Sequence, residues 1–229
     1  MEKKEILINS QFAFFFDQPI QKPEDFWQPI NTALGEIFNQ TPIVQPIPNN
    51  FEFNEIPVVQ MKSTSGVFSL NISRGRVDFF YTGEKDQKFL DIKDDFLNKI
   101  SILFSFLVEK KQKIKRIGFV TRNFIQDEKQ DKSIALLLKE TFKQIHDGNT
   151  FETFIRYVSR DKINIFDINN FTTIEKFANK GIKGILITRD FNTDPEKNYS
   201  DNFTILNIDL FIKEGENKFK FDEIIKLLN

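Results

Sequence analysis

The segment that decides the fold is Phe89-Leu-Asp-Ile-Lys-Asp-Asp-Phe-Leu-Asn-Lys-Ile-Ser-Ile-Leu-Phe-Ser-Phe-Leu-Val-Glu-Lys-Lys111, because it predicts a long helix with a wide apolar surface. Its apolar residues recur at intervals of three and four: Ile92, Phe96, Ile100, Leu103 and Leu107. These intervals place them on one helical face. Further apolar residues widen this face toward the C-terminal end, so we expect the helix to be buried on several sides. The segment is too interrupted by charge to span a bilayer.

The next segment predicts a strand. Residues 114–125 are rich in β-branched and aromatic side chains and follow a short polar link, Gln112-Lys113. We expect the helix, the link and this strand to form the centre of the fold.

The rest of the chain alternates between strand and helix patterns. Alternation and turn chemistry predict strands at 5–16, 184–190 and 203–212, with 171–177 favouring strand. They also predict two hairpins, one turning at Arg74-Gly75 and one at residues 160–162. Helices are predicted from Pro23, at 134–145 and at 219–228, and the proline-rich stretch 41–57 should be irregular until a strand begins before 62.

This order of elements predicts an α+β fold, with a largely antiparallel sheet and helices packed on one face. Residues 1–112 form a β-α-β-β-α half and residues 113–229 a β-α-β-β-β-β-α half, which we expect to belong to one continuous domain. The two halves share an order of elements rather than residue identities. A pseudo-repeat is therefore one interpretation of the chain.

Composition excludes several function classes. Lys and Arg number 32 and Asp and Glu 33, which gives a net charge of −1 and no global attraction to nucleic acid or anionic membranes. Cysteine is absent, so disulfides, thiolate metal sites and cysteine nucleophiles are excluded. The sequence also lacks the GxxxxGK[ST], GxGxxG, HExxH and GxSxG motifs. We expect no cofactor and no membrane partner, and a cytoplasmic location because residues 1–5 carry no secretory pattern.

One cluster of residues predicts a basic, aromatic sheet face. Its members are Arg74, Arg76, Arg116, Arg122, Tyr81, Phe80 and Phe124. Aromatic rings that stack on bases, with arginines over phosphates, are typical of surfaces that bind single-stranded nucleic acid. The alternative is that the rings pack inward and the arginines line a solvated edge.

Two weaker candidates for chemistry remain. His146, the only histidine, ends a predicted helix, and the favoured interpretation is a structural role at that helix end; a general base for RNA cleavage is the alternative. Asp190, Asn192, Asp194 and Asp201, with Asn198, have oxygen ligands at roughly the spacing of a calcium loop. Pro195 stands where that loop needs glycine, so a solvated turn is the competing interpretation and we expect no metal site.

The hairpin arm Arg76-Val-Asp-Phe-Phe80, the long helix and the strand Arg116-Ile-Gly-Phe-Val-Thr-Arg-Asn-Phe-Ile125 resemble a sporadically distributed family of uncharacterised bacterial α+β proteins. A strand at Ile208-Asp-Leu-Phe211 is similar to the C-terminal part of that family. The resemblance implies the fold and supplies no active-site residues. The patchy distribution implies a mobile or defence-associated setting.

Two hypotheses about function follow. The first is a non-catalytic binding or adaptor module that acts through a protein partner or as a homo-oligomer, in a bacterial defence or toxin–antitoxin assembly. Its basis is the lack of catalytic motifs and the 28 phenylalanines, a surplus that predicts an exposed apolar patch. The alternative is a single-stranded nucleic-acid-binding protein or ribonuclease that uses the basic aromatic face.

Overall fold

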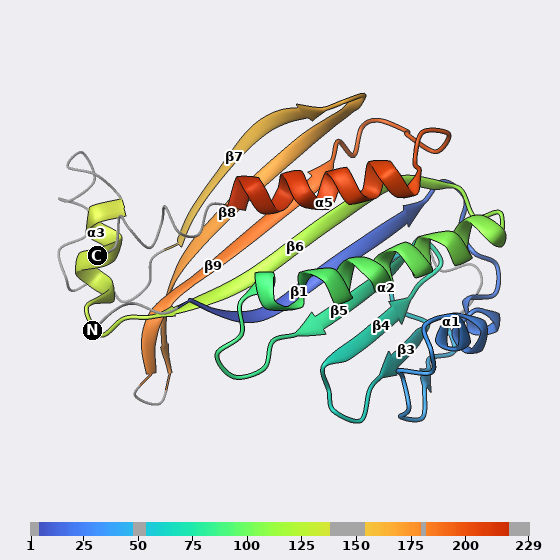
Figure 1. Ribbon diagram of the computed structural model, residues 1–229, viewed down its shortest axis with the longest axis horizontal. Coiled ribbons are helices and arrows are strands. Elements are labelled where there is room, and N and C mark those ends of the chain that lie inside the picture. Colours follow the sequence, from blue (N-terminus) through green and yellow to red (C-terminus); the bar gives the residue numbers. More distant parts are fainter. Residues whose placement is uncertain (1–4, 48–53, 138–153, 180–181, 220–229) are drawn as a thin grey trace.

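The computed structural model describes residues 5–47, 54–137, 154–179 and 182–219. Within these ranges the fold is α+β, and nine strands form one antiparallel sheet in the order β2-β3-β4-β5-β1-β6-β9-β8-β7 (Figure 1). The strands are β1 (Glu5–Phe16), β2 (Ile43–Val44), β3 (Val59–Lys62), β4 (Phe68–Ile72), β5 (Arg76–Thr82), β6 (Ile114–Gln126), β7 (Phe154–Ile163), β8 (Phe166–Asn179) and β9 (Ile182–Thr193).

The two long helices lie side by side across one face of this sheet, α2 (Phe89–Glu109) toward β1 and β5 and α5 (Ile205–Phe219) toward β6 and β9 (Figure 1). The short elements η1 (Pro23–Asp25) and α1 (Trp27–Ala33) extend the helical layer beside α2, and α3 (Gln130–Leu137) packs at the far end against β8 and β9. The predicted α+β fold with helices on one face of an antiparallel sheet is confirmed at this level.

Strand alternation assigns the two faces of the sheet. In β1, Phe12, Phe14 and Phe16 are buried beneath the helices, whereas Gln11 and Phe15 are only partly buried on the opposite face. Successive side chains of a strand point to opposite faces, so each register position fixes the face of its neighbours on adjacent strands. The strand pairs therefore define which side chains share the face that the helices leave open.

The core confirms the prediction for the long helix. Phe96, Ile100, Leu103 and Leu107 are completely buried on α2, at the spacing that the sequence predicts. Burying each such side chain contributes about 1.5–3 kcal/mol relative to exposure. The Phe96 ring packs on aromatic rings of the sheet: its centroid is 5.7 Å from that of Phe79 and 6.0 Å from that of Phe119.

The predicted strand at 203–212 is wrong, because this segment is helix α5. Its buried residues Ile208, Phe211, Ile212 and Gly215 recur at helical spacing, and Thr204 caps the first turn by accepting a hydrogen bond from the backbone N–H of Asn207 at 3.2 Å. Its β-branched and aromatic residues favour a strand locally, but burial of one helical face on the sheet outweighs that preference. The strand at Ile208–Phe211 on which the resemblance partly depends is therefore a helix.

The second predicted hairpin exists, but its turn lies elsewhere. β7 continues through the predicted turn to Ile163, which pairs with Phe166 across a two-residue turn. Asn164 takes a φ of 53°, a conformation that asparagine tolerates better than most residues. The predicted strand at 171–177 belongs to β8, the predicted helix at 134–145 is described only as α3, and that at 219–228 lies almost entirely outside the described residues.

The centre of the sheet joins segments far apart in the sequence. β1 pairs with β6 in an antiparallel register that places Phe12 opposite Phe119. On one side the order continues through β5, β4 and β3, and on the other through β9, β8 and β7. One sheet thus includes strands from both halves of the chain, and β1 and β6, the first strand of each half, lie at its centre.

Candidate functional site

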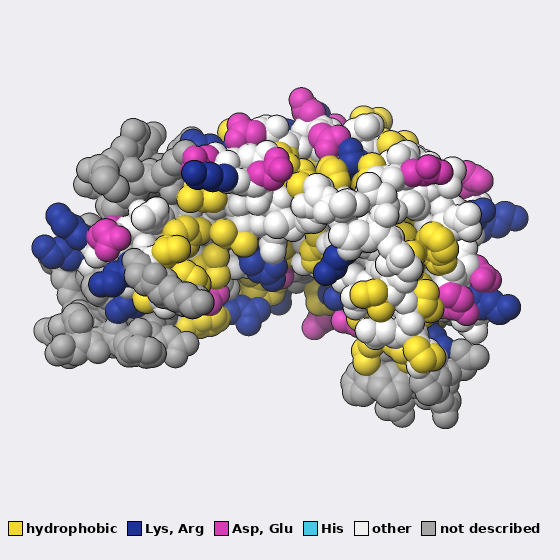
Figure 2. All heavy atoms as spheres, turned by 90° about the horizontal axis from the view of Figure 1, so that it is seen from below, with side chains coloured by type: hydrophobic (Ala, Val, Ile, Leu, Met, Phe, Trp, Pro, Cys, Tyr) yellow, Lys and Arg dark blue, Asp and Glu magenta, His cyan; other side chains and the backbone are white. Residues whose placement is uncertain are grey.

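The candidate site is the open face, which we define as the sheet face opposite α2 and α5. Its central side chains come from β5, β1, β6 and β9: Arg76, Asp78, Phe80, Gln11, Ala13, Phe15, Arg116, Gly118, Val120, Arg122, Thr188, Asp190 and Asn192. Seen edge-on, the molecule is an arch that is hollowed on this side, and Lys and Arg side chains lie around the hollow together with some Asp and Glu side chains (Figure 2). The curvature of the sheet therefore turns a flat row of side chains into a concave surface.

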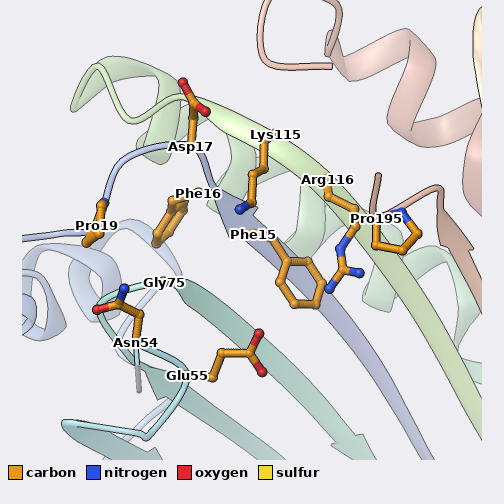
Figure 3. Close-up of a pocket in the computed structure, with 10 residues that line it drawn as sticks. All are labelled: Phe15, Phe16, Asp17, Pro19, Asn54, Glu55, Gly75, Lys115, Arg116 and Pro195. Carbon is orange, nitrogen blue, oxygen red and sulfur yellow. The ribbon is translucent and has the colours of Figure 1, made fainter. Parts of the chain in front are cut away.

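Two adjoining pockets hollow the open face. The central pocket has a volume of about 400 Å³ and is lined by residues of β5, β1, β6 and β9. The end pocket, of about 550 Å³, lies where β1 and β6 leave the sheet centre, with Lys115 and Arg116 near Phe15 and with Glu55 across from them (Figure 3). Both pockets share Phe15 and Arg116, so these two residues stand at the junction of one continuous depression.

Arg116 is held in place by stacking. Phe15 lies opposite Arg116 on one neighbouring strand and opposite Arg76 on the other. The guanidinium carbon of Arg116 is 3.7 Å from the centre of the Phe15 ring, and that of Arg76 is 5.5 Å away. Within the described residues, Arg116 has no ion pair and its side chain makes no hydrogen bond. Partial burial lowers the pKa of Arg116 from its usual value, since few neighbours compensate for its desolvation.

Two further arginines share one row across the sheet. Arg122 on β6 and Arg156 on β7 are linked by the register pairs through Thr188 and Thr173, so both lie on the open face. Arg122 donates a hydrogen bond to Asn9 Oδ1 at 3.2 Å, and the guanidinium carbon of Arg156 lies 4.8 Å from the centre of the Phe171 ring. Neither arginine forms an ion pair with another described residue. Their charges therefore remain available to a ligand.

Asp78 is the most buried carboxylate of the open face, with 2% of its surface exposed. Its Oδ2 is 2.9 Å from Arg76 Nε, and its Oδ1 accepts a hydrogen bond from Gln11 Nε2 at 2.8 Å. Desolvation raises the pKa of Asp78, and the attraction of Arg76 and the Gln11 hydrogen bond offset this only in part. Asp78 thus neutralises Arg76, while the charge of Arg116 is left uncompensated at short range.

Asp190 occupies the other side of the central pocket. Its Oδ1 accepts a hydrogen bond from Asn192 Nδ2 at 2.9 Å. Burial raises the pKa of Asp190, and Arg116, Arg156 and Arg122 lower it through longer-range attraction. One carboxylate therefore faces three arginines, and the surroundings of the central pocket are net positive.

The structure brings together most, but not all, of the residues that the sequence groups as a basic aromatic face. Arg76, Arg116, Arg122, Phe80 and Phe124 share the open face. Phe124 is largely buried against Phe177, with ring centroids 5.5 Å apart.

The other two predicted members lie elsewhere. Tyr81 points to the helix side, where it is buried and its hydroxyl donates to Gln87 Oε1 at 3.2 Å. Arg74 lies in the β4–β5 turn and donates to the backbone oxygen of Ile47 at 3.4 Å. Sequence reasoning misses Phe15 and Arg156, although their alternation along β1 and β7 is the signal that places them on the open face.

The predicted oxygen cluster is spread over two environments. Asp190 and Asn192 lie on β9, whereas Asp194 accepts a turn hydrogen bond from the N–H of Glu196 at 3.0 Å and Asp201 pairs with Lys113 at 3.4 Å. In the part of the chain that the structure describes, no group of three or more His, Asp or Glu side chains is placed to hold a metal ion. His146 lies outside the described residues.

The fold and the open face thus define an α+β protein that presents one concave, arginine-lined sheet surface. No family model and no curated protein matches the chain. Among the described helices, no stretch combines the length and the apolar character that a membrane span requires.

Proposed function

We propose that the protein binds single-stranded nucleic acid on the open face. The observation that carries this proposal is the set of three arginines, Arg116, Arg122 and Arg156, which share this concave surface without an ion pair to any described residue. A chain whose charges nearly cancel overall leaves these three uncompensated on one face.

The geometry of the arginines supports a phosphate ligand. A guanidinium presents a rigid fork of N–H donors that matches phosphate oxygens, and contacts to charged groups are stronger than neutral hydrogen bonds. Stacking on Phe15 and Phe171 fixes the planes of Arg116 and Arg156 before a ligand arrives. Less side-chain entropy is then lost on binding, which favours affinity.

Aromatic rings on the same face support a single strand over a duplex. Phe80 and Phe171 are only partly buried, and register pairs place them in one row with Gln11, Val120 and Asp190. Unpaired bases stack on such rings, whereas the bases of a duplex are already stacked on one another. Arginines beside accessible rings are the arrangement that recognises a strand with unpaired bases.

The large number of phenylalanines, from which the sequence predicts an exposed apolar patch, is explained by the buried core. Phenylalanine supplies the largest completely buried side chains of the described core: Phe12, Phe14, Phe79, Phe96, Phe119, Phe166, Phe191 and Phe211. The surplus therefore fills the space between the sheet and the helices. It does not by itself support the adaptor hypothesis.

A separate observation favours a protein partner as a second candidate. β7 is an edge strand of the described sheet, and its Phe154, Tyr157 and Val158 are about half exposed or more, at 61%, 48% and 50%. An exposed edge strand with apolar side chains can pair with a strand of another chain. Sedimentation of the purified protein and of Val158→Lys tests this: a dimer that the substitution dissociates supports a homo-oligomer, and a monomer in both removes it.

The order of elements also supports the proposal of a pseudo-repeat. The strand order β3-β4-β5-β1 of the first half corresponds to β7-β8-β9-β6 of the second, and α2 and α5 follow the last strand of each half. β1 and β6 then meet antiparallel, as equivalent strands related by a two-fold axis would. Such an arrangement doubles the width of the concave surface.

Equilibrium binding tests the proposed function. We expect a fluorescent RNA of about twelve nucleotides to bind at low salt, and Arg116→Met to weaken binding about tenfold or more, because a charge-assisted contact is lost. Lys213→Met is the matched control, since Lys213 is an exposed cation on α5, on the other side of the sheet. No binding of the unmodified protein at low salt, or equal losses in both variants, would overturn the proposal.

A further inference from the structure

The centre of the open face has a floor almost without side chains. Ala13 on β1 and Gly118 on β6 are direct register partners. A Cβ atom at position 118 would lie 3.5 Å from Asn192 Cβ and 3.8 Å from Phe15 Cε2, which are ordinary contacts. Neither packing nor a positive φ requires glycine here, and glycine weakens a strand. Neighbouring side chains bury most of Ala13, which is 5% exposed, and of Gly118, but both residues line the central pocket, so their small size deepens its floor toward the backbone.

Two side-chain amides flank this floor with fixed orientations. Gln11 Nε2 donates to Asp78 Oδ1 at 2.8 Å, and Asn192 Nδ2 donates to Asp190 Oδ1 at 2.9 Å. An ionised carboxylate only accepts hydrogen bonds, so each amide must direct its NH₂ group at the carboxylate. The carbonyl oxygens of Gln11 and Asn192 accept no hydrogen bond from another described residue. Both amides line the central pocket, which therefore offers two oriented acceptors.

The surroundings restrict what such a pocket takes. Arg116 and Arg122 border the same floor, so the ligand combines N–H donors with nearby negative charge. The volume of about 400 Å³ is sufficient for a nucleoside. Cytosine, adenine and guanine carry an exocyclic amino group that donates to such oxygens, whereas uracil presents a carbonyl oxygen at the corresponding position, which the acceptors repel.

We infer that the central pocket is a subsite for one nucleobase that bears an exocyclic amino group, with Gln11 and Asn192 as the residues that determine specificity. This inference rests on the proposed function. The arginines contact the phosphates of any sequence, whereas the central pocket selects a base by the hydrogen-bonding groups on its edge. The ring lies over the Ala13–Gly118 floor, and its amino group donates to the amide oxygen of Gln11 or of Asn192, which line the pocket from different strands.

Cytidine and uridine homopolymers of about twelve nucleotides are the sharpest probes, because the two bases are similar in size and differ at the group that the acceptors contact. We expect the cytidine oligomer to bind about tenfold more tightly at equal salt. Equal affinities would overturn the subsite and leave the proposed function standing. Failure of both oligomers to bind would overturn both proposals.

Two variants separate recognition from folding. Gln11→Met keeps the size of the side chain but removes the acceptor, and Asp78 retains Arg76 as its partner. We expect the preference for cytidine to fall while affinity for the uridine oligomer changes less than about twofold. Gly118→Val fills the floor and should weaken both oligomers without lowering the melting temperature, because valine favours a strand. An unchanged preference in Gln11→Met would refute the assigned role.

If Gly118→Val lowers the melting temperature, Gly118→Ala supplies the same test with a smaller group. Its methyl carbon fits at 3.5 Å from the nearest atom, so the fold should tolerate it. We expect weaker binding of both oligomers in this variant as well. Full affinity in a folded Gly118→Ala or Gly118→Val protein would show that no ligand approaches the floor.

Discussion

The salt dependence of binding offers a quantitative test of the arginine set. Arg116, Arg122 and Arg156 are three of the open-face cations without an ion pair to another described residue, whereas Arg76 is already compensated by Asp78 and by Glu55 at 3.4 Å. Each of the three that contacts a phosphate releases counterions from the strand. The number of contacts therefore sets how steeply affinity falls with salt.

The expected magnitude follows from the number of arginines. For single strands the slope of log affinity against log salt is about −0.7 per phosphate contact, so three contacts give about −2.1. Raising salt fourfold, from about 50 to 200 mM, then weakens binding about 18-fold through these residues alone. Each single substitution to methionine should reduce the slope by about 0.7, and the triple variant by about 2.

Fluorescence anisotropy at several salt concentrations measures these slopes directly. Lys213→Met changes the net charge by the same amount as each arginine variant but lies on α5, and its slope should match that of the unmodified protein. Circular dichroism confirms that each variant is folded. A triple variant with an unchanged slope would refute the assignment of phosphate contacts to these arginines.

Three further predictions concern stability. Phe96→Ala should lower the free energy of unfolding by about 3–5 kcal/mol and the melting temperature by about 6–20 °C, because the ring is completely buried among other rings. Phe154 is 61% exposed, so Phe154→Ala should change stability little. Equal losses of melting temperature in the two variants would contradict the assignment of Phe96 to the core. Burial raises the pKa of Asp78, so the folded state keeps this proton longer than the unfolded state and stability should fall as pH rises above the ordinary value of 3.8. Denaturation of Asp78→Asn across pH should show a shallower fall than the unmodified protein, and parallel curves would count against the raised pKa. Thr121→Val should raise the unfolding free energy by about 1 kcal/mol, because the buried Thr121 hydroxyl has no hydrogen-bond partner among the described residues, and a loss measured by urea denaturation would refute this.

Much of the fold could be predicted because local patterns and tertiary burial agree there. The repeat of Phe96, Ile100 and Leu103 predicts α2, and the Arg74-Gly75 turn between alternating segments predicts the β4–β5 hairpin. In α5 local preference and tertiary burial conflict. Ile205, Ile208 and Ile212 favour a strand locally, but packing on the sheet buries one face of a helix. The charged residues after Ile212 continue the helical period and are the sequence signal for the correct assignment.

The candidate site could be predicted only in part, for a geometric reason. Alternation along β6 places Arg116 and Arg122 on one face from the sequence alone. Which face the helices cover depends on the packing of α2 and α5, and local sequence preference predicts a strand in place of α5. The stacking of Arg116 on Phe15 depends on the register between β1 and β6, which no local pattern in either strand specifies.

The central position of β1 has a consequence during synthesis. The strand contains Phe14-Phe-Phe16 and borders β6, whose Phe119 pairs with Phe12. At about 5–20 residues per second, a ribosome needs about 5–20 s to produce the chain between these partners. Throughout that interval the edge of β1 that pairs with β6 in the folded protein has no partner strand, and non-local pairing of this kind is intrinsically slow. The newborn protein is therefore most at risk of aggregation before its second half emerges, and chaperone capture at that stage would protect it.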